Sequence, residues 1–203
     1  MSARAAEILG ESGAILTGSH VVYTSGRHGS AYVNKDAVYP STGRVAELCG
    51  LLADLARPYR PEVICGPALG GIILSQWTAH HLGVLAVYAE KVEGGGLALR
   101  RGYDAVVRGR RVVVVEDIVN TGGSLHETVR AVRAAGGEVV AAVALVNRGG
   151  VRAGDVEAPA LHALVEVALD AWDAGACPLC RDGVPVNTAV GKGREFLAKR
   201  GRA

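Results

Sequence analysis

The chain has 203 residues, 49% of them hydrophobic and 21% charged, a balance that excludes a disordered chain and suits one domain, or one domain with a small subdomain. Its 22 basic and 20 acidic residues give a net charge of +2, which is too balanced for a protein coated with basic groups for nucleic acid. Apolar runs stay far below the ~20 residues needed to cross a bilayer, and no export signal is visible, so we expect a cytoplasmic protein with no membrane or nucleic-acid partner.

The first forty residues predict a helix followed by two short strands. Residues 3–16 carry alanine, isoleucine and leucine at helical spacing, and Gly18 is expected just beyond the helix. Residues 20–24 and 31–34 flank a polar loop, and their β-branched and aromatic content is typical of strands.

From Thr42 onward, apolar strands and amphipathic helices alternate. We expect helices at 42–57, 71–82 and 124–135, strands at 63–65, 84–89, 111–116, 139–146 and 161–169, and a hairpin formed by 97–101 and 104–107. Strands that are apolar on both faces predict an α/β fold with a parallel sheet flanked by helices. Ligands bind beyond the carboxyl ends of such strands, so the loops that follow them should converge on one site.

The clearest motif is the segment Val-Val-Val-Val-Glu-Asp-Ile-Val-Asn-Thr-Gly-Gly-Ser-Leu at 112–125. The valines predict a buried strand, and the adjacent carboxylates of Glu116 and Asp117 at its end need a cation or hydrogen-bond donors. The glycine-containing turn then opens a helix whose amides form an anion cradle. This combination suits a phosphate next to vicinal hydroxyls. The plainer interpretation is a strand–turn–helix junction with an N-cap serine and surface acids.

This segment resembles the phosphoribosyl-pyrophosphate (PRPP) signature of type I phosphoribosyltransferases. The resemblance implies that Glu116 and Asp117 hold the ribose hydroxyls, with Asp117 also counted among the catalytic residues. It implies that the 5′-phosphate is bound by Asn120, Thr121, Gly122, Gly123 and Ser124. Mg²⁺ is the implied cofactor, and because it keeps water and substrate oxygens as ligands, no protein residue is assigned to it.

The segment Cys-Gly-Pro-Ala-Leu-Gly-Gly-Ile at 65–72 resembles the loop of the same family that binds the pyrophosphate of PRPP. The resemblance implies binding through the backbone at Ala68, Leu69, Gly70 and Gly71. This loop also lies between a predicted strand and a predicted helix, so the electrostatic argument made for the first turn applies again.

Other stretches resemble bacterial orotate phosphoribosyltransferases. Residues 24–32, Thr-Ser-Gly-Arg-His-Gly-Ser-Ala-Tyr, are similar to a hood that lies over the base, which implies base contacts by Arg27 and Tyr32. The resemblance also places Asn120 and Arg148 at the base, where guanidinium–carboxylate pairing would favour orotate over uracil. The plainer interpretations are a hairpin turn and a solvent-exposed strand-end charge.

Residues 89–103 occupy the place of the family's mobile catalytic loop. The resemblance implies that Lys91, with Arg100 or Arg101, neutralises the departing pyrophosphate, and that Lys91 also contacts PRPP. The glycines at 94–96 are plausible hinges for a lid, and the plainer interpretation is a solvated hairpin. Orotate enzymes of this family are typically homodimers in which this loop reaches the neighbouring site.

The C-terminal part contains Cys177-Pro-Leu-Cys180 and a run of basic residues after 191. A single Cys-x-x-Cys is half of a tetrahedral zinc site, but no second pair follows, and the nearest histidine in sequence, His162, lies on a predicted strand. We interpret the motif as a structural turn, with zinc or a reversible disulfide as alternatives, and the basic run as a solvated helix. Cys49 and Cys65 lie in apolar contexts typical of core residues.

The predicted organisation has three parts: helix and hood at 1–40, a PRPP-binding α/β core at 41–170, and a C-terminal extension at 171–203 with the cysteine turn and the basic helix. The resemblance implies transfer of a 5-phosphoribosyl group from PRPP to orotate, giving orotidine 5′-monophosphate and pyrophosphate in pyrimidine nucleotide biosynthesis. The alternatives are a phosphoribosyltransferase for another nucleobase, and a non-catalytic PRPP-binding regulator of the same fold.

Overall fold

The computed structural model describes residues 2–23, 25–167 and 170–200. The chain forms two compact units: one contains Met1–Ile8 and Ser41–Val167, and the other contains Leu9–Pro40 and Ala168–Ala203. We call them the core unit and the small unit. Thr24 of the predicted hood and Arg202 of the basic run lie outside the described residues.

The core unit is built on a six-stranded sheet with the strand order β5-β4-β3-β6-β7-β8. The strands are β3 (Val63–Pro67), β4 (Leu85–Lys91), β5 (Leu97–Ala98), β6 (Arg111–Val119), β7 (Glu138–Asn147) and β8 (Leu161–Glu166). All neighbouring strands are parallel except β5, which is an antiparallel edge beside β4. The predicted α/β fold with a parallel sheet is therefore confirmed.

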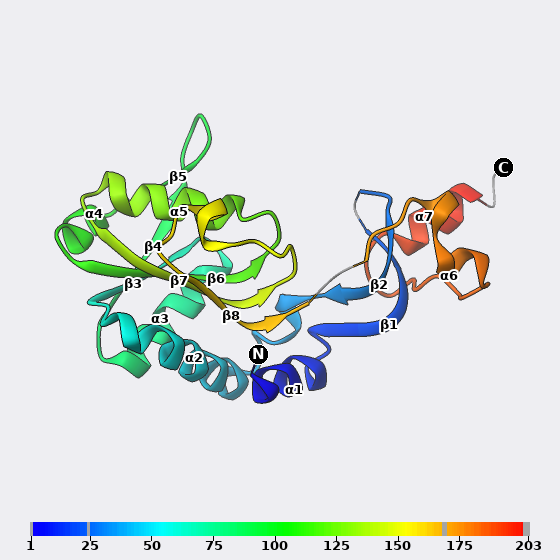
Figure 1. Ribbon diagram of the computed structural model, residues 1–203, viewed down its shortest axis with the longest axis horizontal. Coiled ribbons are helices and arrows are strands. Elements are labelled where there is room, and N and C mark those ends of the chain that lie inside the picture. Colours follow the sequence, from blue (N-terminus) through cyan, green and yellow to red (C-terminus); the bar gives the residue numbers. More distant parts are fainter. Residues whose placement is uncertain (1, 24, 168–169, 201–203) are drawn as a thin grey trace. The chain divides into compact units, whose positions relative to one another are not determined.

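Helices cover both faces of this sheet, α2 and α3 on one side and α4 and α5 on the other (Figure 1). Their bounds are α2 (Thr42–Ala56), α3 (Gly70–Leu82), α4 (Tyr103–Val107) and α5 (Gly123–Ala134), and α1 (Ala3–Glu11) precedes them in the chain. Short 3₁₀ helices lie at Lys35–Ala37, Arg57–Tyr59, Ala153–Val156 and Ala174–Ala176. None of the described helices has both the length and the apolar character that a membrane crossing requires.

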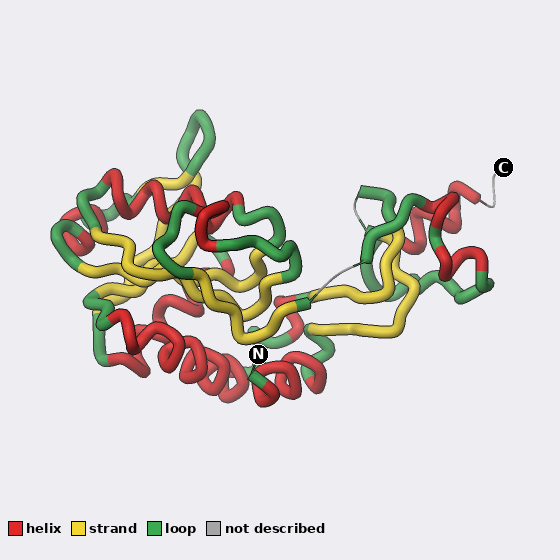
Figure 2. Tube along the Cα trace, in the orientation of Figure 1, coloured by secondary structure: helices red, strands yellow, loops and turns green. Residues whose placement is uncertain are grey.

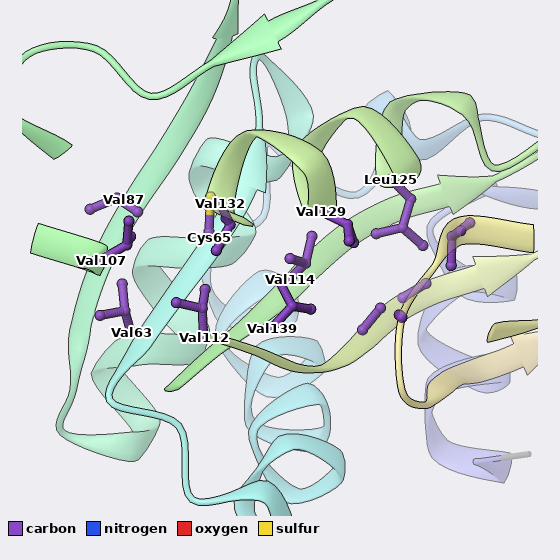
Figure 3. Close-up of a cluster of buried hydrophobic side chains, with 14 of the residues drawn as sticks. Val63, Cys65, Val87, Val107, Val112, Val114, Leu125, Val129, Val132 and Val139 are labelled. Atoms are coloured by element: carbon purple, nitrogen blue, oxygen red, sulfur yellow. The ribbon is translucent and has the colours of Figure 1, made fainter. Parts of the chain in front are cut away.

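The packing of α5 against β6 positions the site. Leu125, Val129 and Val132 follow helical spacing, and all three are buried against Val112 and Val114 of β6 (Figure 3). Each fully buried aliphatic side chain contributes about 1.5–3 kcal/mol. Because side chains alternate along a strand, the same face of β6 that presents the even-numbered valines to α5 also carries residue 116.

The predicted hairpin of 97–101 and 104–107 is wrong in its second half. Leu97–Ala98 does pair with β4, but residues 103–107 form helix α4. Tyr103, Val106 and Val107 all pack against the core, and this i, i+3, i+4 spacing places side chains on one face of a helix rather than a strand. Tertiary burial of these three side chains thus decided the conformation.

The first helix ends at Glu11, earlier than predicted. Gly13 has a φ of +69°, its N–H donates to the carbonyl of Gly10, and the N–H of Ala14 donates to that of Leu9. These two bonds form a Schellman C-cap, which terminates the helix and leaves the following residues extended. Residues 15 and 16 therefore begin strand β1 (Ile15–Val22) instead of ending a helix.

The small unit joins the β-hairpin to the C-terminal segment. Strand β1 pairs antiparallel with β2 (His28–Val33), and the C-terminal segment contributes α6 (Pro178–Arg181) and α7 (Gly193–Arg200) (Figure 2). Isolated bridges link His20 to Val186 and His28 to Trp172. The hairpin and the C-terminal segment, about 150 residues apart, therefore share one backbone hydrogen-bond network.

Candidate active site

The turn between β6 and α5 encloses a cavity of about 270 Å³. It is lined by Glu116 and by every residue from Ile118 to Leu125. Gly122 is the N-cap of α5 with a φ of +82°, and a Cβ there would lie 2.8 Å from Cγ1 of Val156, so the turn accommodates only glycine without strain. The N-terminal end of α5 therefore points its backbone amides at a cavity suited to an anion.

The two acids lie at the carboxyl end of β6 and are both buried, Glu116 at 6% and Asp117 at 5% exposure. Glu116 lines the cavity, and its Oε1 accepts from the backbone N–H of Asp117 at 3.1 Å. Strand alternation directs Asp117 to the other face of β6, where its Oδ1 accepts from the N–H of Ile118 at 2.6 Å. The adjacent carboxylates thus avoid direct repulsion, and Glu116 is the one presented to the cavity beside α5.

A second cavity of about 480 Å³ adjoins the same turn. Thr121, Gly123 and Ser124 line both cavities, and Lys91, at the end of β4, lines the second one. The structure therefore brings Lys91 and the predicted phosphate turn to one place, although 29 residues or more separate them in the sequence. Glu127 of α5 also lines this cavity and was not selected from the sequence, although it lies one helical turn after Ser124.

The segment between β4 and β5 projects from the sheet in Figure 1. Its three glycines have φ values of +90°, +96° and +84°, and a Cβ at any of them would meet open space. At its base the guanidinium of Arg101 bonds Oε2 of Glu90 at 3.1 Å, and this carboxylate raises the pKa of Arg101. Arg100 is exposed. The cations predicted for the lid therefore flank a turn whose backbone requires glycine.

The predicted pyrophosphate loop joins β3 to α3. A Cβ on Gly71 would lie 2.6 Å from Cδ of Pro67, so strand and helix meet here without room for a side chain. Gly70 and Gly71 start α3, at the helix end that favours anions. The N–H of Ala68 donates to the carbonyl of Ala89 in β4, and the side chain of Leu69 is 84% exposed. The loop is thus tied to the sheet at one end and open at the other.

Two of the four predicted base contacts meet in the core unit. Nε of Arg148 donates to Oδ1 of Asn120, and the backbone N–H of Arg148 donates to the carbonyl of Val119 at 3.0 Å. A Cβ on Gly149 would collide with the carbonyl oxygen of Asn120, so the loop after β7 packs backbone against backbone on the phosphate turn. Arg148 is thereby held next to the first cavity, which Asn120 lines.

The other two predicted base contacts belong to the small unit. The guanidinium of Arg27 donates to the carbonyl of Ala171 and lies 3.6 Å from Oδ1 of Asp173. Tyr32 is half-buried on β2, opposite Leu16 of β1. The C-terminal segment thus orients Arg27. Sequence analysis could not reveal this contact, because Arg27 and Ala171 lie far apart in the chain.

A parallel sheet with an acid-lined anion cradle at its carboxyl edge defines a class of proteins that bind phosphorylated ribose. In agreement, the family model described as "Phosphoribosyl transferase domain" matches residues 34–163, and the chain belongs to this family. Within the family it belongs to the orotate phosphoribosyltransferases, as predicted from the sequence. It is 36% identical over 189 residues to that enzyme from Thermotoga maritima, covering 92% of this chain and 97% of the relative.

Two further relatives support this placement. The orotate phosphoribosyltransferase of Caulobacter vibrioides is 41% identical over 169 residues, covering 82% of this chain and 85% of the relative. The crystal structure of Mycobacterium tuberculosis orotate phosphoribosyltransferase in complex with PRPP superposes with a TM-score of 0.62 at 26% identity, covering 81% of this chain and 94% of that one.

Proposed function

We propose that this chain transfers the 5-phosphoribosyl group of PRPP to a ring nitrogen of orotate. A bond forms between that nitrogen and C1′ of the ribose, and the bond from C1′ to the pyrophosphate oxygen breaks. The electron pair leaves with pyrophosphate, and the ring N–H proton passes to solvent. The products are orotidine 5′-monophosphate and pyrophosphate.

One observation carries the proposal: the phosphate turn at 120–124 contributes to two adjoining cavities, one containing Glu116 and the other containing Lys91. PRPP carries phosphate groups at both ends of a ribose that bears hydroxyls. This substrate therefore needs three kinds of group: a carboxylate that accepts hydrogen bonds from the hydroxyls, a helix end that binds the 5′-phosphate, and a cation for the pyrophosphate.

The residues would act chiefly by positioning and by electrostatics. Glu116, which lines the first cavity, would hold the ribose hydroxyls. The turn from Asn120 to Ser124 would hold the 5′-phosphate, and the loop from Ala68 to Gly71 the pyrophosphate. Lys91, assisted by Arg100 or Arg101, would neutralise negative charge that grows on pyrophosphate as the bond to C1′ lengthens. Because positive charge develops at C1′ at the same time, buried carboxylates near the ribose also favour the transition state.

Mg²⁺ fits this donor set, because Glu116 and Asp117 offer the hard carboxylate oxygens it prefers. When bound, it would supply positive charge that offsets the negative charge of the pyrophosphate. Glu116, which lines the cavity, is the protein group best suited to assist in holding it, directly or through water.

The base would be selected by its carboxylate. Arg148 presents a guanidinium that the carboxylate of orotate can pair with, and Asn120 orients it through the bond to Nε. Arg27 and Tyr32 would contribute from the hood segment. Uracil lacks the carboxylate, so it would leave the Arg148 charge without this partner.

The remaining expectations are a homodimer, in which Lys91 serves its own site or that of the neighbouring subunit, and a cytoplasmic location. Light scattering after gel filtration tests the dimer. Mixing Lys91→Ala and Asp117→Asn chains then tests which site Lys91 serves, because activity returns in mixed dimers only if the loop acts across the interface.

The proposal is tested by incubating the protein with PRPP, Mg²⁺ and orotate and following the loss of orotate absorbance. We expect turnover with orotate, none with uracil, and a rise of about 10-fold or more in the KM for PRPP in Glu116→Gln. Glu138→Gln, at the exposed start of β7, is the matched control. Turnover only with another base would instead assign a different phosphoribosyltransferase, and PRPP binding without turnover on any base would assign a regulator.

A further inference from the structure

Four metal-binding side chains meet inside the small unit, in a region the proposed reaction does not use. They are His20 of β1, His28 of β2, Cys177, and Cys180 of α6, and their ligand atoms all lie within 4.8 Å of one another. His20, His28 and Cys177 are each 2% exposed or less. Burying polar groups without partners costs free energy. Imidazoles and thiols that converge from three chain segments therefore indicate a shared partner such as a metal ion.

Three distances among these atoms match those expected around a single tetrahedral ion. Zinc bonds of about 2.3 Å to sulfur and 2.0–2.1 Å to nitrogen place neighbouring ligand atoms about 3.3–3.8 Å apart. Nε2 of His20 lies 3.6 Å from Sγ of Cys177 and 3.7 Å from Sγ of Cys180, and Nδ1 of His28 lies 3.3 Å from Sγ of Cys180. The two ring nitrogens are 2.8 Å apart, so the imidazole rings need to move slightly apart to admit the ion.

The hydrogen bonds around His20 fix which of its nitrogens is available. Nδ1 lies 2.7 Å from the carbonyl oxygen of Val184, and because a carbonyl only accepts, Nδ1 carries the proton. Nε2 of the neutral ring then presents its lone pair to the cluster. A ligating histidine whose other nitrogen donates to a backbone carbonyl is the usual arrangement at protein metal sites.

The two cysteines are oriented by the short helix that follows the first of them. Cys177 is the N-cap of α6, and its Sγ accepts from the backbone N–H of Cys180 at 3.4 Å. This bond turns both sulfurs to the same side. Both cysteines are free thiols in the structure, so both sulfurs are available as ligands.

We propose that His20, His28, Cys177 and Cys180 bind one structural Zn²⁺ ion. Two thiolates and two imidazoles complete the tetrahedral shell that zinc prefers, which leaves no open position for a substrate. On binding, the two thiol protons pass to solvent and the proton of His28 moves from Nδ1 to Nε2. A two-iron cluster also uses two cysteines and two histidines, but it holds each pair on a different iron, whereas these four atoms all lie within 4.8 Å of one another.

The ion would hold together parts of the chain that are 157 residues apart, from His20 to Cys177. The small unit comprises only Leu9–Pro40 and Ala168–Ala203, and units of this size commonly need a metal or disulfide to be stable. His28 directly follows Arg27, so the site also fixes the turn that carries Arg27. His162, the nearest histidine in sequence, lies apart from this cluster, and its Nε2 bonds the hydroxyl of Tyr59 at 2.6 Å in the core unit. The proposal therefore takes the zinc alternative of the sequence analysis in place of the structural turn.

The test measures metal in the full-length protein, purified without a histidine tag. We expect about one zinc ion per chain by mass spectrometry of the elements, and less than about 0.1 in Cys180→Ser and His20→Asn. Cys49→Ala is the matched control and should keep the full content, because burial within α2 raises the pKa of the Cys49 thiol to about 12 and makes it a poor ligand.

Cobalt provides a readout that requires no variant to fold. Replacing zinc by Co²⁺ in the wild-type protein should produce the intense visible absorption of a tetrahedral site together with thiolate-to-cobalt charge-transfer bands. The proposal is overturned if reduced wild-type protein binds neither ion after incubation with excess metal and gel filtration. It is equally overturned if iron is found in place of zinc, or if mass spectrometry of the native protein shows a Cys177–Cys180 disulfide.

Discussion

The guanidinium of Arg148 donates from Nε to the side-chain oxygen of Asn120, 28 residues earlier in the chain. This bond joins the loop after β7 to the phosphate turn after β6, because these strands are parallel neighbours whose carboxyl ends lie at the same edge of the sheet. The arginine proposed to recognise the base and the turn proposed to bind phosphate therefore form one structural assembly.

Replacing Arg148 by alanine should affect orotate and spare PRPP. Loss of a charge-assisted hydrogen bond costs about 1.5–3 kcal/mol, so the KM for orotate should rise about 10- to 100-fold. Steady-state kinetics with each substrate varied in turn measures both constants. Arg108→Ala, whose side chain pairs with Asp104 on α4, should leave both unchanged. An equal rise in the KM for PRPP would show that Arg148 acts by holding the turn through Asn120 rather than by recognising the base.

Replacing Lys91 by alanine should lower kcat by about 10²–10³, because a preorganised cation no longer meets the departing pyrophosphate. The far-ultraviolet circular dichroism and the Tm should not change, since Lys91 is exposed at the end of β4. Lys199→Ala on α7 removes the same charge from the small unit and should retain full turnover. Near wild-type kcat in Lys91→Ala would exclude this lysine from the reaction.

Replacing Gly122 by alanine should destabilise the core unit by about 1–3 kcal/mol, because alanine is strained at a φ of +82° and its Cβ would press on Val156. Urea denaturation measures the change in the free energy of unfolding. Gly43→Ala provides the contrast: it lies in the first turn of α2 with open space around its Cβ, and the substitution should stabilise by up to about 1 kcal/mol. Equal effects at the two glycines would contradict the geometry of the turn.

Stability should fall at alkaline pH in part through Cys65. Burial raises the pKa of its thiol to about 12 from the ordinary value of 9.0. Between these values the unfolded chain has lost this proton and the folded chain retains it, so the free energy of unfolding falls as pH rises, by up to about 1.4 kcal/mol per pH unit. Cys65→Ala removes this contribution.

The comparison is the free energy of unfolding of both proteins by urea at about pH 8 and about pH 10.5. The cavity created by the substitution lowers stability equally at both values, so only the slope reports the thiol. Identical slopes in wild type and Cys65→Ala would show that the thiol ionises as readily in the folded chain as in the unfolded one.

The sequence was most informative where a function depends on consecutive residues. The valine strand, the paired acids and the glycine turn at 120–124 were identified from local patterns, because strand burial, helix capping and positive φ are properties of neighbouring residues. Two local predictions were wrong. Residues 104–107 form a helix rather than a hairpin strand, because Tyr103 and Val107 are buried on one helical face. The first helix, capped by Gly13, ends at Glu11, five residues before the predicted end at residue 16.

The amino-acid sequence by itself determined the fold class and the family, and it supplied the proposal for the segments that contact PRPP. Only the tertiary structure decided that Glu116 is the acid beside α5, that Lys91 shares a cavity with Ser124, and that Cys177 and Cys180 meet His20 and His28. The physical reason is the distance along the chain over which each interaction acts. Hydrogen bonds and side-chain spacing within an element act over a few residues. The register of parallel strands and the joining of distant segments depend instead on burial of the whole core.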